Sequence, residues 1–255
     1  MLIMKLKDKV AIITGASGDI GKTFSLALAK EGASIVLVDI DIDGMRDTAE
    51  TIKSMGGKVI MFKVDITNEE QVNDMAKRVY NEFGRIDILV NNAAVYGMLE
   101  KKKPFYEISL QEFEKVLRVN VIGVWLCSKA TFPYMRKIGK GKIINIASTT
   151  VHSGAFGLAH YIASKAAVIG LTRALAREMG DYNINVNAIA PGLTLTKATL
   201  KLNPADYLEN RKQLRSIKRD QKPEDLVGTL IFLASDDSDF ISGQTIIVDG
   251  GSVFS

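Results

Sequence analysis

Cysteine, histidine and tryptophan are scarce in this 255-residue sequence, which has one, two and one of them respectively. The single cysteine, Cys127, excludes a disulfide within the chain and is typical of a reducing compartment. It follows Val124, Trp125 and Leu126, so we expect a packed core thiol and not a reactive one. No metal site is expected.

The sequence also lacks a hydrophobic run long enough to span a bilayer. The apolar residues 1–4 are interrupted at Lys5, so no signal peptide is recognised and a cytoplasmic protein is expected. The net charge is +4, but most lysines alternate with acids and no aromatic–basic repeat occurs. Neither a membrane nor a nucleic acid is therefore an expected partner. An apolar content of 47% is ample for a core, and residues 1–255 fit one domain.

Short apolar runs alternate with helical patterns along the chain. The predicted strands are 9–14, 35–38, 59–64, 86–90, 143–146, 184–189 and 245–248. The predicted helices are 22–30, 45–55, 69–83, 110–135, 161–179 and 224–234. Such alternation predicts an α/β fold, a doubly wound parallel sheet of about seven strands with helices on both faces.

The first of these units has the arrangement of a dinucleotide-binding site. A buried strand at 9–14 leads into the glycine-rich turn Gly15–Gly21, and the second strand ends at Asp39. Glycines let backbone and a helix N-terminus approach a pyrophosphate, while the terminal acid binds the ribose hydroxyls. The alternative is an ordinary βαβ turn in which Asp39 is only a loop acid.

Polar residues recur where the predicted strands end. In a parallel sheet these carboxyl ends meet at one edge, where ligands bind. The residues expected together there are Gly15, Asp39, Asp65, Asn91, Asn92, Ser148 and Pro191.

Tyr161 and Lys165 form a Tyr-x-x-x-Lys pair, and Ser148 lies upstream of it. Residues four apart share one helix face, so the ammonium can lie beside the phenol. A nearby cation favours the phenolate and should lower the pKa of Tyr161, as an acid/base for an alcohol or ketone oxygen requires. By itself such a pair is close to a chance occurrence.

Together these motifs resemble the short-chain dehydrogenase/reductase family over nearly the whole chain. The matching segments are Thr14-Gly15…Gly21, Asp65, Asn91-Asn92-Ala93, Asn120, Ser148, Tyr161-x-x-x-Lys165, Pro191-Gly192 and Val248-Asp249-Gly250-Gly251. Two positions depart from the family pattern. Asp19 replaces the middle glycine of the turn and is tolerable beside a pyrophosphate only if it points outward. Ala94 replaces the glycine after Asn-Asn-Ala.

The resemblance implies four catalytic residues. Tyr161 would exchange the proton with the substrate oxygen, and Ser148 would polarise that oxygen. Lys165 would lower the pKa of Tyr161 and bind the nicotinamide ribose, while Asn120 would hold a water that links Lys165 to solvent. The alternatives are a strand-end cap for Ser148 and local hydrogen bonding for Asn120.

The resemblance also implies the cofactor contacts. They are Gly15, Ser17, Asp19, Ile20, Gly21, Asp39, Ile40, Asp65, Ile66, Asn92, Ala93, Tyr161, Lys165, Pro191, Gly192, Thr194 and Thr196. Asp39 would accept hydrogen bonds from both ribose hydroxyls of NAD and repel the 2′-phosphate of NADP. Ser17 stands where an NADP enzyme of the family usually has a basic residue, so NAD is the expected cofactor. Asn91 is expected to be structural.

The segment 195–217 lacks a strong period, and we expect residues at about 194–222 to form a mobile lid. They contain eight Lys/Arg and three Asp/Glu, which leaves open whether the lid selects anionic substrates. The pocket residues expected beside it are Tyr96, Met98, Thr150, His152, Phe156, Leu200 and Tyr207.

The expected function is an NAD-dependent oxidoreductase for a small-molecule secondary alcohol or its ketone. The alternatives are a 3-oxoacyl-thioester reductase and a nonenzymatic NAD-binding regulator. The resemblance implies a homotetramer, and the apolar helices and the C-terminal Val253 and Phe254 offer surfaces for it.

Overall fold

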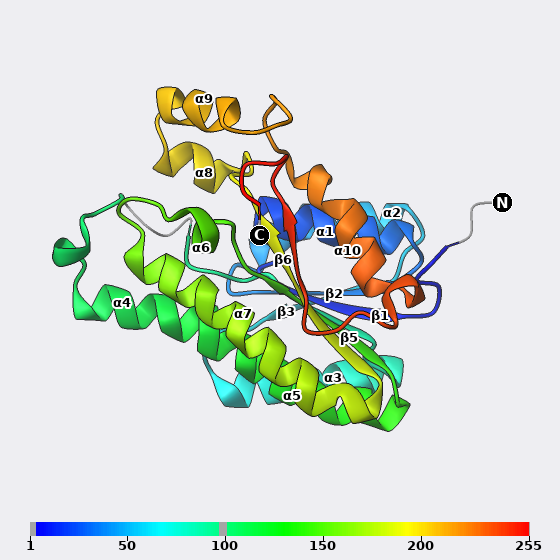
Figure 1. Cartoon of the computed structure of the whole chain (residues 1–255). Coiled ribbons are helices and arrows are strands. Elements are labelled where there is room, and N and C mark those ends of the chain that lie inside the picture. The colour runs from blue at the N-terminus through cyan, green and yellow to red at the C-terminus, as the bar shows by residue number, and fades with distance from the viewer. Residues whose placement is uncertain (1–3, 97–100, 255) are drawn as a thin grey trace.

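The structure is a computed structural model that describes residues 4–96 and 101–254. Met98, one of the expected pocket residues, lies outside these ranges. Figure 1 shows a twisted sheet between two layers of helices. Within the described ranges, none of the helices has the length and apolar content to cross a bilayer.

Seven parallel strands form the sheet, in the spatial order β3-β2-β1-β4-β5-β6-β7. They are β1 (Val10–Thr14), β2 (Ser34–Asp39), β3 (Val59–Lys63), β4 (Ile88–Asn91), β5 (Gly141–Ile146), β6 (Ile184–Pro191) and β7 (Thr245–Val248). Every residue of β1, β4 and β5 is buried, because helices cover both faces of a parallel sheet. The predicted fold and its seven strands are confirmed, with shifts of one to two residues at strand ends.

One face of the sheet packs against α1 (Asp19–Lys30), α2 (Arg46–Ser54) and α10 (Val227–Ala234), around Phe24 and Leu28. The other face packs against α3 (Glu69–Phe83), α5 (Val124–Ile138) and α7 (Ala159–Met179). Cys127 is fully buried in this second layer, as expected, and burial raises its pKa to about 12.

The predicted helix 110–135 has an interruption. It consists of α4 (Leu110–Leu117), a π-helical turn (Arg118–Gly123) and α5. Asn120 lies in this turn, completely buried. π-Helical turns are frequent at functional sites because they place one residue outside the regular helical register.

Two further helical predictions need correction. The first helix begins at Asp19 and not at Lys22, so Asp19 is its first residue. The predicted helix 224–234 divides into a 3₁₀ turn at Pro223–Leu226 and α10.

The expected lid, whose sequence has no strong period, contains α8 (Lys197–Leu202) and α9 (Ala205–Gln213). Both lie above the carboxyl edge of the sheet in Figure 1, near the short helix α6 (Thr150–Ser153). Thr196 caps α8, its side chain accepting a hydrogen bond from the Thr199 amide, which is the local signal that the sequence contained.

Candidate functional site

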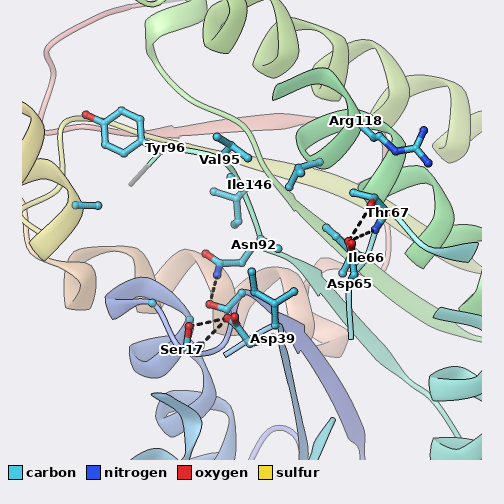
Figure 2. Close-up of a pocket in the computed structure, with 18 of the residues that line it drawn as sticks. Ser17, Asp39, Asp65, Ile66, Thr67, Asn92, Val95, Tyr96, Arg118 and Ile146 are labelled. Atoms are coloured by element: carbon cyan, nitrogen blue, oxygen red, sulfur yellow. Dashed lines mark hydrogen bonds between the residues drawn. The ribbon is translucent and has the colours of Figure 1, made fainter. Parts of the chain in front are cut away.

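A large cavity of about 1280 Å³ opens at the carboxyl edge of the sheet. Figure 2 shows side chains from several strand ends turned into it. Most of the cofactor residues expected from the sequence line this cavity: Gly15, Ser17, Asp19, Ile20, Gly21, Asp39, Ile40, Asp65, Ile66, Asn92, Ala93, Tyr161, Lys165 and Thr196. The sheet therefore brings together residues that are up to 181 positions apart, from Gly15 to Thr196.

Backbone approaches closely at the turn between β1 and α1. A Cβ added to Gly15 would lie 2.7 Å from the Cα of Ala93, and Gly15 has a positive φ of 66°. A Cβ on Gly21 would lie 2.2 Å from the carbonyl oxygen of Gly15. Only glycine fits at either position, and the turn directs the N-terminus of α1 at the cavity.

Asp39 faces the same turn from the end of β2. Its Oδ2 accepts hydrogen bonds from the Ser17 amide at 3.0 Å and the Ser17 hydroxyl at 2.8 Å. Its Oδ1 accepts one from the Asp41 amide at 3.0 Å. Each carboxylate oxygen has two lone pairs, so Oδ1 keeps acceptor capacity toward the cavity.

The two asparagines at the end of β4, Asn91 and Asn92, have different hydrogen-bond partners. Asn92 Nδ2 donates to the carbonyl oxygens of Thr14 and Gly15, both at 3.0 Å, tying the end of β4 to the glycine turn. Asn91 Nδ2 donates instead to Asn145 Oδ1 at 2.9 Å, across neighbouring strands. The prediction that Asn91 is structural agrees with this burial and bonding.

Asp65, at the end of β3, has a carboxylate oriented by its own loop. Its Oδ1 accepts hydrogen bonds from the amide and hydroxyl of Thr67 at 2.9 and 2.8 Å. Both Asp65 and Thr67 line the large cavity.

A second, smaller cavity of about 130 Å³ lies beside the first. It is lined by Ser148 just after β5, by Pro191 at the end of β6, and by Gly192 and Thr194 beyond it. Tyr161, in the first turn of α7, lines both cavities. Ser148 thus belongs to the small cavity, Lys165 to the large one, and the Tyr161 phenol to both.

Burial dominates the ionisation of the Tyr161–Lys165 pair. It raises the pKa of Tyr161 above its ordinary value of 10, with the Ser148 hydroxyl acting in the opposite direction. It lowers the pKa of Lys165 to about 8. The Lys165 ammonium donates to the carbonyl of Ile146 at 2.6 Å and lies 5.7 Å from the centroid of the Tyr161 ring. The expectation that Lys165 lowers the Tyr161 pKa toward neutrality is therefore not met in this structure.

Both groups of the Asn120 amide are already hydrogen-bonded. Its Oδ1 accepts from the Val95 amide at 2.7 Å, and its Nδ2 donates to Ser164 Oγ at 3.0 Å. The side chain therefore joins the π-helical turn to α7 and to the segment after β4.

Asp19 turns toward the expected lid. Its Oδ2 accepts a hydrogen bond from the backbone amide of Lys197 at 2.6 Å, 178 residues along the chain. The carboxylate therefore faces the start of α8, and both Asp19 and Lys197 line the large cavity. No motif in the sequence indicated the contact.

The small cavity contains three of the expected pocket residues, Tyr96, Thr150 and Tyr207. His152, Phe156 and Leu200 do not line it, and Phe156 is 78% exposed. The expected pocket residues did not include Lys102, Leu158, Asn203 or Arg211, although Arg211 belonged to the basic lid. Lys102 and Arg211 could have been found as cations on either side of the predicted pocket, whereas nothing local marked Leu158 or Asn203.

Comparisons with known proteins agree with this geometry. A family model described as enoyl-(acyl carrier protein) reductase matches residues 15–253. An uncharacterized oxidoreductase of Mycobacterium tuberculosis is 43% identical over 248 residues, covering 96% of this chain and 98% of that protein. A 3-oxoacyl-[acyl-carrier-protein] reductase of Thermotoga maritima is 36% identical over 98% of this chain and 100% of that protein.

A solved structure of 7α-hydroxysteroid dehydrogenase, complexed with NADH and 7-oxo glycochenodeoxycholic acid, superimposes with a TM-score of 0.93. It is 34% identical and covers 99% of this chain and 97% of that one. These proteins are oxidoreductases of matching length, so the likeness covers the sheet edge as well as the core.

Replacing Lys165 by methionine should alter how stability depends on pH. A buried lysine with a pKa of about 8 holds fewer protons than the unfolded lysine between pH 8 and 10, so its contribution to wild-type stability rises across that window. The free energy of unfolding of wild type minus that of Lys165→Met should increase by about 2 kcal/mol from pH 8 to pH 10. Denaturant unfolding of both proteins measures this difference.

The control is Lys201→Met, which removes an exposed lysine of α8. A pH-independent difference between Lys165→Met and wild type would show that the Lys165 ammonium is not desolvated.

Proposed function

The chain belongs to the short-chain dehydrogenase/reductase family, and from that premise we propose that this oxidoreductase interconverts a secondary alcohol and a ketone with NAD(H). One observation carries the proposal: the Tyr161 phenol borders both cavities, with Ser148 in the smaller and Lys165 in the larger. A proton donor at that boundary meets the substrate on one side and the cofactor on the other.

The large cavity fits a dinucleotide. The glycine turn leaves room for a pyrophosphate at the N-terminus of α1, a helix of 12 residues. Asp39 would hold the adenosine ribose, Asp65 the adenine edge, and Asn92 with Ala93 the adenosine side. When bound, the nicotinamide ring supplies or accepts the hydride. The backbone near Thr194 and Thr196 would hold the carboxamide and phosphates.

The chemistry of this chain's own residues follows from their positions. Ser148 donates a hydrogen bond to the substrate oxygen, and Tyr161 delivers or removes the proton on that oxygen. Lys165 binds the nicotinamide ribose and carries positive charge below pH 8, which stabilises a phenolate brought near it. Asn120, in the π-helical turn, would hold the water of the proton relay.

The choice of NAD over NADP is supported by the surroundings of Asp39. Its carboxylate, held by Ser17, would lie beside any 2′-phosphate and repel it. The following residues Ile40, Asp41 and Asp43 add no compensating cation.

The reduction of a 3-oxoacyl thioester is the alternative activity. It is supported by the likeness to the 3-oxoacyl-[acyl-carrier-protein] reductase. Assays of neutral ketones and of an acyl-CoA thioester, each with NADH and NADPH, discriminate the two activities.

Tyr161→Phe should lower kcat by a factor of about 10²–10⁴ while NADH still binds, because the phenol supplies the proton and other groups supply cofactor affinity. Steady-state rates and a fluorescence titration with NADH measure the two effects. The control is Tyr106→Phe, which changes an exposed tyrosine outside both cavities. Retention of more than about a tenth of wild-type kcat would contradict the assignment of Tyr161 as acid/base.

Asp39→Ala should lower the ratio of kcat/KM for NADH over NADPH, and Asp39→Arg should lower it further, because repulsion of the 2′-phosphate is first removed and then reversed. Asp47→Ala makes the same charge change on an exposed position of α2. A wild-type ratio below one would already refute the argument from Asp39.

We also propose that residues 194–222 act as a lid, held in the present position by the Asp19–Lys197 contact. Asp19→Ala should make tryptic cleavage within this segment several-fold faster, since cleavage follows local opening. The matched control is Asp74→Ala on α3. Equal cleavage rates for the two variants would remove Asp19 from lid closure.

Finally, we propose a homotetramer. Leu110 and Trp125 are exposed on α4 and α5, and Phe240 and Phe254 are exposed in the segments before and after the edge strand β7. Symmetric contacts at two such surfaces would bury both sets. Light scattering should give the mass of four chains at micromolar concentration, and a smaller assembly for Trp125→Glu. A monodisperse wild-type monomer would exclude the proposal.

A further inference from the structure

Two cations, Lys102 and Arg211, line the small cavity, and none of the described residues that line it is acidic. We propose that the substrate carries a carboxylate and that Lys102 and Arg211 bind it. The inference rests on the proposed function and names the substrate class of the same site: a compact oxo acid and the corresponding hydroxy acid.

Arg211 differs from the neighbouring cations of the lid. Lys212 pairs with Glu209, Arg219 pairs with Asp225, and the Lys218 ammonium donates to a backbone carbonyl. Arg211, half-buried on α9, makes no hydrogen bond or ion pair within residues 4–96 and 101–254. Its guanidinium is therefore available to an anion in the cavity.

Arg215, another cation of the lid, is occupied by hydrogen bonds within the protein. It is buried, and its guanidinium donates to the carbonyls of Leu193 at 2.6 Å and Arg219 at 2.7 Å. Its pKa is lowered by burial and also by the positive charge of Arg211. Arg215 thus supports the lid, while its charge adds to the field around Arg211.

Lys102 is held against the same helix. Its Nζ lies 3.7 Å from the centroid of the Tyr207 ring, a cation–π contact. Tyr207 and Arg211 are four residues apart on α9, so both face the same side of that helix. The two cations are thereby brought to one side of α9.

The backbone around Lys102 is fixed from the other side. The Lys103 amide donates to the carbonyl of Gly157 at 3.2 Å. A Cβ on Gly157, whose φ is +75°, would lie 2.7 Å from Lys102 Cβ. Lys102 is therefore positioned between the loop before α7 and the lid, and does not extend freely into solvent.

The rest of the small cavity suits the remainder of such a substrate. Tyr96, whose ring centroid lies 5.2 Å from that of Tyr161, and Leu158 provide apolar wall. Ser148 and Tyr161 supply the hydroxyls that meet the carbonyl. A cavity of about 130 Å³ accommodates a short or singly ringed acid.

The test compares an acid with its own ester. 4-Acetylbenzoate and methyl 4-acetylbenzoate are assayed with NADH on wild type, Arg211→Gln, Lys102→Gln and Lys201→Gln. Lys201 is an exposed cation of α8 outside the cavity, so its variant makes a matched change of charge.

Wild type should prefer the acid. Arg211→Gln and Lys102→Gln should each lower kcat/KM for the acid by roughly 10- to 100-fold, mostly through KM, because a charge-assisted hydrogen bond is lost. The ester should change by less than about threefold, and Lys201→Gln should change neither. Added salt should weaken turnover of the acid alone.

A binding measurement separates failure of this inference from failure of the proposed function. Calorimetric titration should give tighter binding of benzoate than of benzamide to wild type, and a loss of roughly 10- to 100-fold in benzoate affinity for Arg211→Gln. Turnover of the ester without preference for the acid would overturn the inference and leave the function intact. If benzoate binding depended on Arg211 but the protein reduced neither ketone, the proposed function would be refuted and the anion site would remain.

The phosphates of coenzyme A are a second source of negative charge. If Arg211→Gln lowered kcat/KM for 3-oxobutanoyl-CoA and left that for 4-acetylbenzoate unchanged, the cations would serve a phosphate-bearing carrier. That result would overturn the inference.

Discussion

The close approach of the β1 turn to the end of β4 is the constraint on which the site depends. Asn92 holds the carbonyls of Thr14 and Gly15 with one amide, at a distance that no side chain on Gly15 would permit. This contact directs the start of α1 at the large cavity and presents Ser17 to Asp39. The cofactor side is therefore assembled by backbone packing, and its polar side chains are secondary supports.

Burial, and not only the proximity of the two side chains, determines the pKa values of Tyr161 and Lys165. Tyr161 and Lys165 are both inside the protein, which favours the neutral form of each. The lysine retains its charge near neutral pH because its pKa stays near 8, and it is anchored on the Ile146 carbonyl. In the proposed reaction, a nearby charge would have to stabilise the phenolate of this buried pair.

The lid shows how little a count of charges reveals. Eight cations in residues 194–222 suggested a broad positive field, yet Lys212 and Arg219 pair with acids, and the Arg215 guanidinium is hydrogen-bonded to backbone carbonyls. Arg211 differs from the other cations of the lid because it lines the small cavity. The same holds for Asp19, whose carboxylate seemed out of place beside a pyrophosphate and instead contacts Lys197.

Much of the fold followed from the chain itself. The local hydropathy pattern shows that buried strands alternate with amphipathic helices. The order of the parallel strands then places residues that follow them at one edge of the sheet, namely Gly15, Asp39, Asp65, Ser148 and Pro191. The Tyr161–Lys165 spacing likewise needed only a helix. These features are local, or follow from the rules of parallel sheets.

Tertiary structure alone decided the rest. The π-helical turn at Asn120 and the lid helices depend on contacts with Val95, Ser164 and Asp19, which lie far away in sequence. The pKa of Tyr161 depends on how deeply its ring is buried. The availability of Arg211 depends on its place in the cavity wall and on the ion pairs that neighbouring cations form with nearby carboxylates. The sequence by itself determined which functional groups the chain carries and which of them share a helix or strand. Folding determined how far each group is removed from water and which partner it has. The physical reason is that desolvation and pairing depend on residues far apart in the sequence, which no local pattern connects.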